Sequence, residues 1–294
     1  MRLSNFHGDR VGMRMQYKAP WKFLKERQLR PKKTLGQNFL ADPSTAALII
    51  RKSGVGPEDA VLEIGAGLGA LTLPLSHAAK RVYAVEKDAA LAGLLQEQLR
   101  KQGIENVFVE NADIFDIDPA ALGAGQSGGL RVFGNLPYYI SSQVLLYLIR
   151  YRLCIRQADL MFQKEVAQRL TAVPSTKSYS RLSVIMQYYT EIRRTAAVSS
   201  HLFWPSPKVD SEVLQFRFKT CPEPVLQDEA RFLAVVKAAF GKRRKTLQNA
   251  LRASELGADR ETLMQAFDAA AINPQSRAET LTIDQFVHLA NALS

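Results

Sequence analysis

The sequence predicts an α/β fold, a mostly parallel sheet with helices on both faces, followed by a small all-helical domain. Short apolar segments rich in Val and Ile alternate with helical segments from residue 44 to about 165. This alternation is typical of a parallel sheet that is covered on both sides. A glycine-rich turn follows the first strand, and Pro222 and Pro224 separate the sheet from a series of helical patterns.

The predicted elements follow one another with short connections. Strands of the parallel sheet are predicted at 60–64, 81–86, 107–110, 131–134 and 158–162. Helices among them are predicted at 44–52, 70–79, 89–102, 142–151, 164–171 and 181–189. An antiparallel pair of strands at 192–198 and 212–218 is expected to close the sheet. The remaining helices are predicted at 228–240, 246–252, 260–269 and 283–293.

The first 30 residues show no clear apolar period, and we expect a mobile basic arm there. Residues 1–33 contain ten Lys and Arg side chains against two acidic ones. Met13 and Met15 are candidate initiators, so the arm could precede the true start of the protein. A mitochondrial presequence is an alternative that the modest serine content disfavours. The expected parts are an arm at 1–30, an α/β domain at 31–221 and a helical domain at 222–294.

Composition narrows the class of protein. The chain has 294 residues, of which 47% are hydrophobic, so it can bury a sizeable core. It contains no apolar run long enough to span a bilayer and no apolar segment of a secretory signal. Cys154 and Cys221 are far apart and the four histidines are scattered, so we expect reduced thiols, a cytoplasmic location and no metal site.

The positive charge is unevenly distributed. The formal net charge is +11, and besides the first 33 residues it gathers in one further cluster, Lys242-Arg243-Arg244-Lys245. Clustered cations favour a polyanionic partner, because neutralising phosphates releases condensed counterions. A solvated basic surface is the other interpretation, and charge alone leaves the two open.

The glycine-rich turn predicts a nucleoside cofactor. Gly65, Gly67 and Gly69 lie between a predicted strand and a predicted helix, where glycine allows a sharp turn and close approach to a ligand. Glu86 ends the next strand and is placed to accept ribose hydroxyls, while Asp113 is placed to accept from an adenine amino group. The spacing differs from the G-x-G-x-x-G pattern of NAD sites. It therefore favours S-adenosylmethionine, whose methionine carboxylate and amine would occupy the turn.

A second turn, Asn135-Leu136-Pro137-Tyr138, follows the fourth strand and indicates the reaction. The exocyclic amine of adenine is not basic, so its attack depends on positioning rather than on a general base. The Asn135 side-chain oxygen and the Leu136 carbonyl are two acceptors for its hydrogens. Pro137 stiffens the turn, and Tyr138 offers a face for stacking. In isolation the turn favours a structural interpretation, a turn with a buried tyrosine. After a cofactor loop, at the fourth strand, it predicts adenine-N6 methylation.

These motifs resemble those of the KsgA group of ribosomal RNA adenine-N6,N6-dimethyltransferases. The resemblance covers residues 31–294 and implies a Rossmann-like S-adenosylmethionine-dependent methyltransferase sheet with a small C-terminal helical domain. The segment 33–40 is similar to one that lies over the cofactor, which implies cofactor contacts for Gln37, Asn38 and Leu40. A helix-entry loop, with Asp42 and Ser44 as caps, is the alternative for that segment. Gly65, Glu86, Asp113 and Asn135 match the family's cofactor and catalytic positions.

Two later stretches carry the resemblance further. The stretch 203–211 resembles Phe-x-Pro-x-Pro-Lys-Val-Asp-Ser, which implies that Phe203 stacks on the target adenine opposite Tyr138. The stretch 240–247 resembles a basic helix entry and 277–281 the family's last motif. Both favour the KsgA group over the related Erm enzymes of large-subunit RNA. Tyr139 stands where the family usually has asparagine, which affects the expected rigidity of the loop and the second methylation.

The resemblance implies dimethylation of two adjacent adenines in the 3′-terminal hairpin of small-subunit rRNA. It also implies that the substrate is a partly assembled small subunit, with Lys242, Arg243, Arg244 and Lys245 contacting RNA phosphates. We expect a monomeric protein without membrane association. An Erm-like enzyme and a non-catalytic assembly factor are the alternatives, although the latter would be expected to have a broken cofactor loop or Asn-Leu-Pro-Tyr turn.

Overall fold

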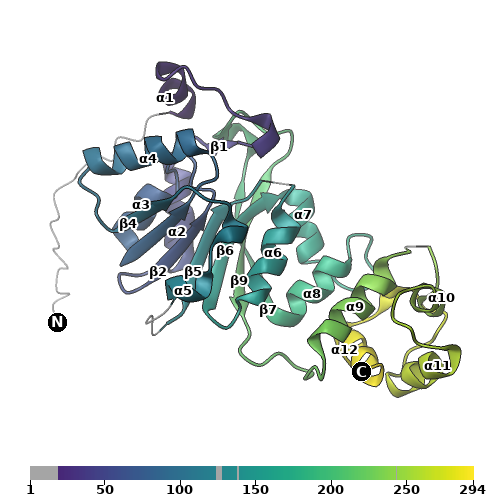
Figure 1. Ribbon diagram of the computed structural model, residues 1–294. Coiled ribbons are helices and arrows are strands. Elements are labelled where there is room, and N and C mark those ends of the chain that lie inside the picture. The colour runs from purple at the N-terminus through teal and green to yellow at the C-terminus, as the bar shows by residue number, and fades with distance from the viewer. Residues whose placement is uncertain (1–18, 124–127, 138, 243) are drawn as a thin grey trace, which may run out of the picture.

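A computed structural model describes residues 19–123, 128–137, 139–242 and 244–294 of the protein (Figure 1). Seven strands of these residues form one sheet in the order β4-β3-β2-β5-β6-β9-β7. The first five strands in that order are parallel, and β9 pairs antiparallel with both β6 and β7. The strands are β2 (Ala60–Ile64), β3 (Arg81–Val85), β4 (Val107–Glu110), β5 (Leu130–Asn135), β6 (Ile155–Gln163), β7 (Thr190–Val198) and β9 (Ser211–Phe218).

Helices cover both faces of this sheet, as its largely buried central strands require (Figure 1). Successive residues of a strand point to opposite faces, so Val61 is buried in one cluster and Leu62 in the other. The first face packs on α2 (Pro43–Ser53), α3 (Thr72–Ala78) and α4 (Ala89–Lys101), and the second on α6 (Ser141–Arg150), α7 (Lys164–Leu170) and α8 (Arg181–Tyr189). The predicted α/β fold is confirmed, with ends of the predicted elements that differ by at most three residues.

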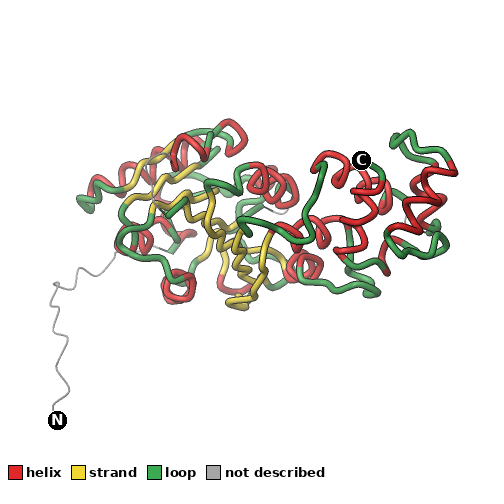
Figure 2. The backbone as a smooth tube through the Cα atoms, turned by 90° about the horizontal axis from the view of Figure 1, so that it is seen from below, coloured by secondary structure: helices red, strands yellow, loops and turns green. Residues whose placement is uncertain are grey.

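Four helices gather at one end of the molecule (Figure 2). They are α9 (Glu229–Phe240), α10 (Leu247–Arg252), α11 (Arg260–Ala269) and α12 (Ile283–Ala292). Phe232 of α9 is fully buried against the rings of Tyr188 and Tyr189, at 5.1 and 6.5 Å between centroids. One continuous apolar cluster thus joins these helices to the sheet. The division into domains at residue 222 stays a prediction. None of the helices in the described ranges has the length and apolarity that a membrane crossing requires.

The segment before residue 31 contains a helix that its sequence pattern does not predict. Within the described part of the expected arm, α1 (Pro20–Glu26) has Phe23 and Leu24 buried in a cluster with Phe39 and Leu91. The chain then turns back at Gln28, whose φ of 57° lies in the left-handed region. The Leu29 N–H donates to the Leu24 carbonyl and the Gln28 N–H to that of Lys25, which closes the helix end as a Schellman motif. The expectation of an arm without structure is therefore wrong from Pro20 onward.

A two-stranded antiparallel sheet joins segments far apart in the sequence. Strand β1 (Phe39–Leu40) pairs with β8 (Phe203–Trp204), placing Leu40 opposite Phe203 and Phe39 opposite Trp204. Asp42 caps α2 directly afterwards, accepting from the backbone N–H groups of Ser44 and Thr45. The helix-entry interpretation of this segment is thus correct for Asp42, and it coexists with a place beside the pocket described below.

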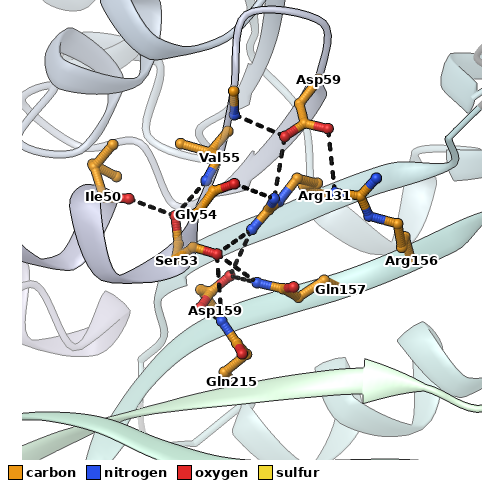
Figure 3. A network of polar contacts seen from close by, with 11 residues as sticks. Ile50, Ser53, Gly54, Val55, Asp59, Arg131, Arg156, Gln157, Asp159 and Gln215 are labelled. Carbon is orange, nitrogen blue, oxygen red and sulfur yellow. Dashed lines mark hydrogen bonds and ion pairs between the residues drawn. The ribbon is translucent and has the colours of Figure 1, made fainter.

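A buried polar network ties α2 to the amino end of the sheet (Figure 3). The Arg131 guanidinium on β5 donates to the carbonyls of Ser53 and Gly54 at 2.6 and 2.9 Å, so a cation sits at the C-terminus of α2. It also pairs with Asp59 at 3.1 Å and with Asp159 at 3.7 Å. The side-chain amides of two glutamines complete the network by donating to Asp159: Gln157 and Gln215.

Candidate active site

The carboxyl ends of β2, β3 and β5 surround one pocket. In a parallel sheet, ligands bind where the strand order reverses, because the loops on either side diverge there. Here the chain runs outward from β2 to β4 and returns to β5 on the other side of β2. Every described residue predicted for the cofactor and catalytic site lines this pocket: Gln37, Asn38, Leu40, Gly65, Gly67, Glu86, Asp113, Asn135, Leu136, Pro137 and Phe203. Tyr138 lies outside the described residues.

The glycine turn is held by the strand beside it. The Gly65 and Ala66 N–H groups both donate to the Val85 carbonyl, and φ is positive at Gly67 and Gly69. A Cβ at Gly69 would lie 2.8 Å from the Leu95 side chain of α4. Gly67 faces the pocket instead, and its missing side chain leaves space beside the Phe39 ring. The positive φ therefore favours glycine at both positions, and at 67 the missing side chain also lets a ligand approach the backbone.

Glu86 is fixed as an acceptor at the end of β3. Its Oε2 accepts from the Gly67 N–H and its Oε1 from the Asp88 N–H, each at 2.8 Å. Burial raises the pKa of this carboxyl, while the two backbone N–H groups favour its ionised form. The carboxylate thus has a set orientation toward the pocket before any ligand arrives.

Asp113 stands at the pocket rim, at the N-terminus of the short helix η2 (Ile114–Asp116). Its Oδ2 accepts from Lys87 Nζ at 2.6 Å and its Oδ1 from the Phe115 N–H at 3.2 Å. The hydrogen bond from Lys87 is the main cause that lowers the pKa of Asp113. The side chain is thus an ionised acceptor at neutral pH.

Gln37 and Asn38 line the pocket from the segment just before β1. Gln37 Nε2 donates to Asp88 Oδ2 at 3.0 Å, and its Oε1 accepts from the Lys32 N–H at 2.7 Å. Lys32 Nζ pairs with the same Asp88 at 2.9 Å. These contacts tie the segment before β1 to the N-cap of α4. Asp88 was not predicted as a site residue, although its position two residues after Glu86 and before a helix is a recognisable capping signal.

Asn135 is oriented by the backbone of the same segment before β1. Its Nδ2 donates to the Asn38 carbonyl at 3.0 Å, which leaves the Oδ1 atom as the acceptor of this amide. The Leu136 side chain is buried and its N–H donates to the Met161 carbonyl. The Pro137 carbonyl accepts from Ile140 N and Ser141 Oγ, which closes the turn onto α6. The described residues of the turn are therefore held in place by both β6 and α6.

Phe203 and Tyr139 also line the pocket. Phe203 is 4% exposed and reaches the pocket from β8, beside Leu40. Tyr139, which replaces the family's usual asparagine, is 57% exposed at the mouth of the pocket, with its ring edge close to Gly36. The replacement thus changes the surface of the mouth and leaves the acceptors at Asn135 in place.

Glu63 is a pocket residue that sequence reasoning missed. It lies in β2 just before the glycine turn, is 2% exposed, and its Oε2 has no hydrogen-bond partner among the described residues. Burial raises its pKa to about 8, although the neighbouring Thr72 lowers it, and the charge of Glu86 adds to the rise. The signal was an acidic residue inside an otherwise apolar strand. An unpartnered buried carboxyl oxygen beside a pocket suits a cationic ligand group, such as the ammonium of a bound methionine moiety.

The basic cluster is separate from this pocket. Lys242, Arg244 and Lys245 are exposed in the connection between α9 and α10, and Arg243 lies outside the described residues. None of these three lines the pocket. The Leu247 N–H donates to the Ser276 carbonyl, so the connection lies beside the stretch that leads to Arg277. The structure thus places two of the family-like stretches, 240–247 and 277–281, next to each other.

The fold and the pocket define a Rossmann-like methyltransferase. Residues 28–294 match the family described as ribosomal RNA adenine dimethylase. The ribosomal RNA small subunit methyltransferase A of Desulforapulum autotrophicum is 46% identical over 275 residues, covering 93% of this chain and 96% of that protein. The protein of the same name from Moorella thermoacetica is 41% identical over 277 residues, covering 92% and 95%.

Solved structures agree with this assignment. A dimethyladenosine transferase from Plasmodium falciparum superposes with a TM-score of 0.70 at 25% identity, covering 85% of this chain and 95% of that one. The 23S rRNA methyltransferase ErmE superposes with a TM-score of 0.64 at 28% identity, covering 87% and 99%. The chain belongs to the ribosomal RNA adenine dimethylase family, and the resemblance read from its motifs is confirmed.

Proposed function

We propose that this protein transfers methyl groups from S-adenosylmethionine to N6 of two adjacent adenines in the 3′-terminal hairpin of small-subunit rRNA. The observation that carries the proposal is the orientation of Asn135. Its amide nitrogen is held by the Asn38 carbonyl, so its Oδ1 remains to accept from an amine in the same pocket that the glycine turn lines.

Different residues of the pocket bind different parts of the cofactor in this proposal. Gly65 and Gly67 leave room for the methionine moiety, and the Glu63 carboxyl offers its unpartnered oxygen to the ammonium group. Glu86 accepts from the ribose hydroxyls and Asp113 from the adenine amino group. Gln37, Asn38 and Leu40 cover the bound molecule. When bound, S-adenosylmethionine supplies an electrophilic methyl group on a sulfonium.

The target adenine is held by acceptors and aromatic rings. Asn135 Oδ1 and the Leu136 carbonyl accept the two N6 hydrogens, which aims the nitrogen lone pair at the methyl carbon. Their dipoles stabilise the positive charge that develops on N6 as the carbon–sulfur bond breaks. Phe203 and Tyr138 stack on the flipped base. One N6 proton passes to water, and a second transfer gives the dimethylated base.

The substrate belongs to the small subunit in this proposal. The relatives from Desulforapulum autotrophicum and Moorella thermoacetica are named as small-subunit methyltransferases, which favours this substrate over the large subunit on which ErmE acts. We further propose that a monomer acts on a partly assembled particle in the cytoplasm. Residues 222–294 would form its RNA-binding domain, with Lys242, Arg243, Arg244 and Lys245 contacting phosphates.

The proposal is tested with purified protein, labelled S-adenosylmethionine and small subunits from cells that lack this methylation. Mapping should find two adjacent adenines with two methyl groups each, which would also show that Tyr139 permits the second transfer. Label in large-subunit RNA would assign the protein to the Erm enzymes. Cofactor binding without label on any subunit would indicate an assembly factor.

A further inference from the structure

A second, open groove lies outside the cofactor pocket, between α1 and β8. In Figure 1, α1 stands over β1 at one edge of the molecule. The groove is lined by Trp21, Lys25, Gln28, Leu29, Arg30 and Trp204. The sequence contains two tryptophans, and both are in this lining. Tryptophan has the largest side-chain ring system, and a surface groove lined by two tryptophans is typical of a binding site.

The groove is built on a docked element, so its shape is set before a ligand binds. Phe23 and Leu24 bury the inner side of α1 against Phe39 and Leu91. Trp21 is on the outer side and is 50% exposed. The left-handed turn at Gln28 directs Leu29 back into the same apolar cluster, in which Trp204 is partly buried.

Trp204 of the groove directly follows Phe203, which lies at the proposed place of the target adenine. Phe203 and Trp204 are consecutive in β8, and consecutive strand residues point to opposite sides. Phe203 accordingly lines the cofactor pocket, whereas Trp204 lines the groove. The cofactor pocket and the groove thus lie on opposite sides of one short strand, β8.

The charge of the groove matches a nucleotide. Its lining, within the described residues, contains the cations Lys25 and Arg30 and no acidic side chain. Indole rings stack on any base, and cations beside them neutralise the phosphates that connect the bases. A groove for an apolar peptide segment would not call for two cations among six lining residues.

We infer that this groove binds an unpaired nucleotide of the RNA next to the target adenine, with its base against Trp21 and Trp204 and its phosphate near Lys25 and Arg30. The inference rests on the proposed function, since it takes RNA as the substrate. It deepens that function by assigning a second base site, which is occupied while the first base is in the catalytic pocket.

Tryptophan fluorescence tests the inference without any methyl transfer. Both emitters of the chain are in the groove, so a single-stranded oligoribonucleotide containing two adjacent adenines should quench the protein's tryptophan emission on binding. Trp21→Phe leaves Trp204 as the single reporter, and this variant should still be quenched. Binding of the RNA, detected by anisotropy of a label on it, without a change in tryptophan emission would overturn the inference.

The KM and kcat for methylation of small subunits distinguish a role of this groove in RNA binding from a role in catalysis. Trp21→Ala should raise the KM for the subunit about tenfold, as expected for the loss of one stacking face, and should leave kcat and cofactor affinity unchanged. Trp21→Phe should restore most of the affinity. Lys25→Gln and Arg30→Gln should also raise KM, whereas Lys22→Gln is a matched control, because Lys22 is exposed on the same helix and does not line the groove.

The outcomes distinguish this inference from the proposed function. If the wild-type protein methylates no subunit, the proposed function fails, while the fluorescence result still decides whether RNA enters the groove. If methylation proceeds and Trp21→Ala has a wild-type KM, the groove is not a base site. If Trp21→Ala weakens binding to the particle but free RNA leaves the emission unchanged, the groove contacts a protein of the particle and the inference is wrong.

Discussion

The polar network around Arg131 and the pocket at the carboxyl end of the sheet each bury an acidic side chain, yet they use it differently. In the network, Asp159 meets Arg131 and two glutamine amides, so its charge is compensated inside the protein (Figure 3). At the carboxyl end, Glu63 faces a pocket with one oxygen unpartnered among the described residues. Burial raises the pKa of both carboxyls, but only Asp159 has a cation against it. The compensated carboxyl helps to hold the elements together, whereas the carboxyl oxygen that faces the pocket is available to a ligand.

The largest expected effect is at the amino end. Arg131→Met should lower the free energy of unfolding by about 3–5 kcal/mol, because it leaves Asp159 and the end of α2 without their cation. Urea denaturation measures this. Arg156→Met is the matched control: Arg156 pairs with the same Asp59 but is half exposed, so its loss should cost less than about 1 kcal/mol. Equal effects of the two variants would contradict the role given to the buried network.

At the carboxyl end, Asn135→Ala should act on turnover. Removing this acceptor should lower kcat about 10²- to 10³-fold, with cofactor affinity largely retained. Single-turnover methylation of small subunits and calorimetric cofactor titration would measure the two quantities. Asn106→Ala is a control from the other end of the sheet, since Asn106 donates to the carbonyls of Ser76 and Ala79. Near-normal turnover of the Asn135 variant would exclude the acceptor mechanism.

Glu63 makes stability depend on pH. Its pKa is about 8 in the folded protein and 4.5 is its ordinary value, so between these limits the folded state keeps a proton that the unfolded state loses. The free energy of unfolding should therefore fall as pH rises from 4.5 to about 8, by up to about 1.4 kcal/mol per pH unit, and level off above. Glu63→Gln should flatten this decline in denaturation experiments. A variant with the wild-type slope would show that Glu63 titrates normally.

The smallest effect is expected in the basic connection, which belongs to neither end of the sheet. Changing Lys242, Arg244 and Lys245 to glutamine should leave stability and kcat unchanged. The logarithmic salt dependence of RNA binding should become shallower by about 0.7–0.9 for each phosphate that the variant no longer neutralises. Lys80→Gln, at the amino end of β3, serves as the control cation. An unchanged salt slope would remove the connection from the RNA interface.

The sequence predicted the parts of this fold that local pattern determines. The strands of the parallel sheet and the residues at their carboxyl ends were found because apolar strands and glycine turns are local signals. Helix α1 was missed, since seven residues form a stable helix only when tertiary contacts such as those of Phe23 and Leu24 hold it. The pairing of β1 with β8 was missed because two strands of two residues, far apart in the chain, leave no periodic signal.

The same distinction applies to the polar groups. Glu86 and Asn135 were predicted from their positions after strands, and the structure places them at one pocket. The partners of Arg131 come from α2, β6 and the loop before β2, which no local pattern connects. Glu63 stood out as an acid among apolar residues, but its unpartnered oxygen is a property of the folded pocket.

The pairing of β1 with β8 has a thermodynamic consequence. One of these strands continues the segment that lines the pocket with Gln37 and Asn38, and the other carries both Phe203 and Trp204. Because the two strands are paired, we expect a displacement of one strand by its ligand to displace the other and to change the affinity for the second ligand. Such linkage is reciprocal: cofactor should strengthen RNA binding by the same factor by which RNA strengthens cofactor binding. We expect these four backbone positions to couple the binding of the two substrates of the proposed function.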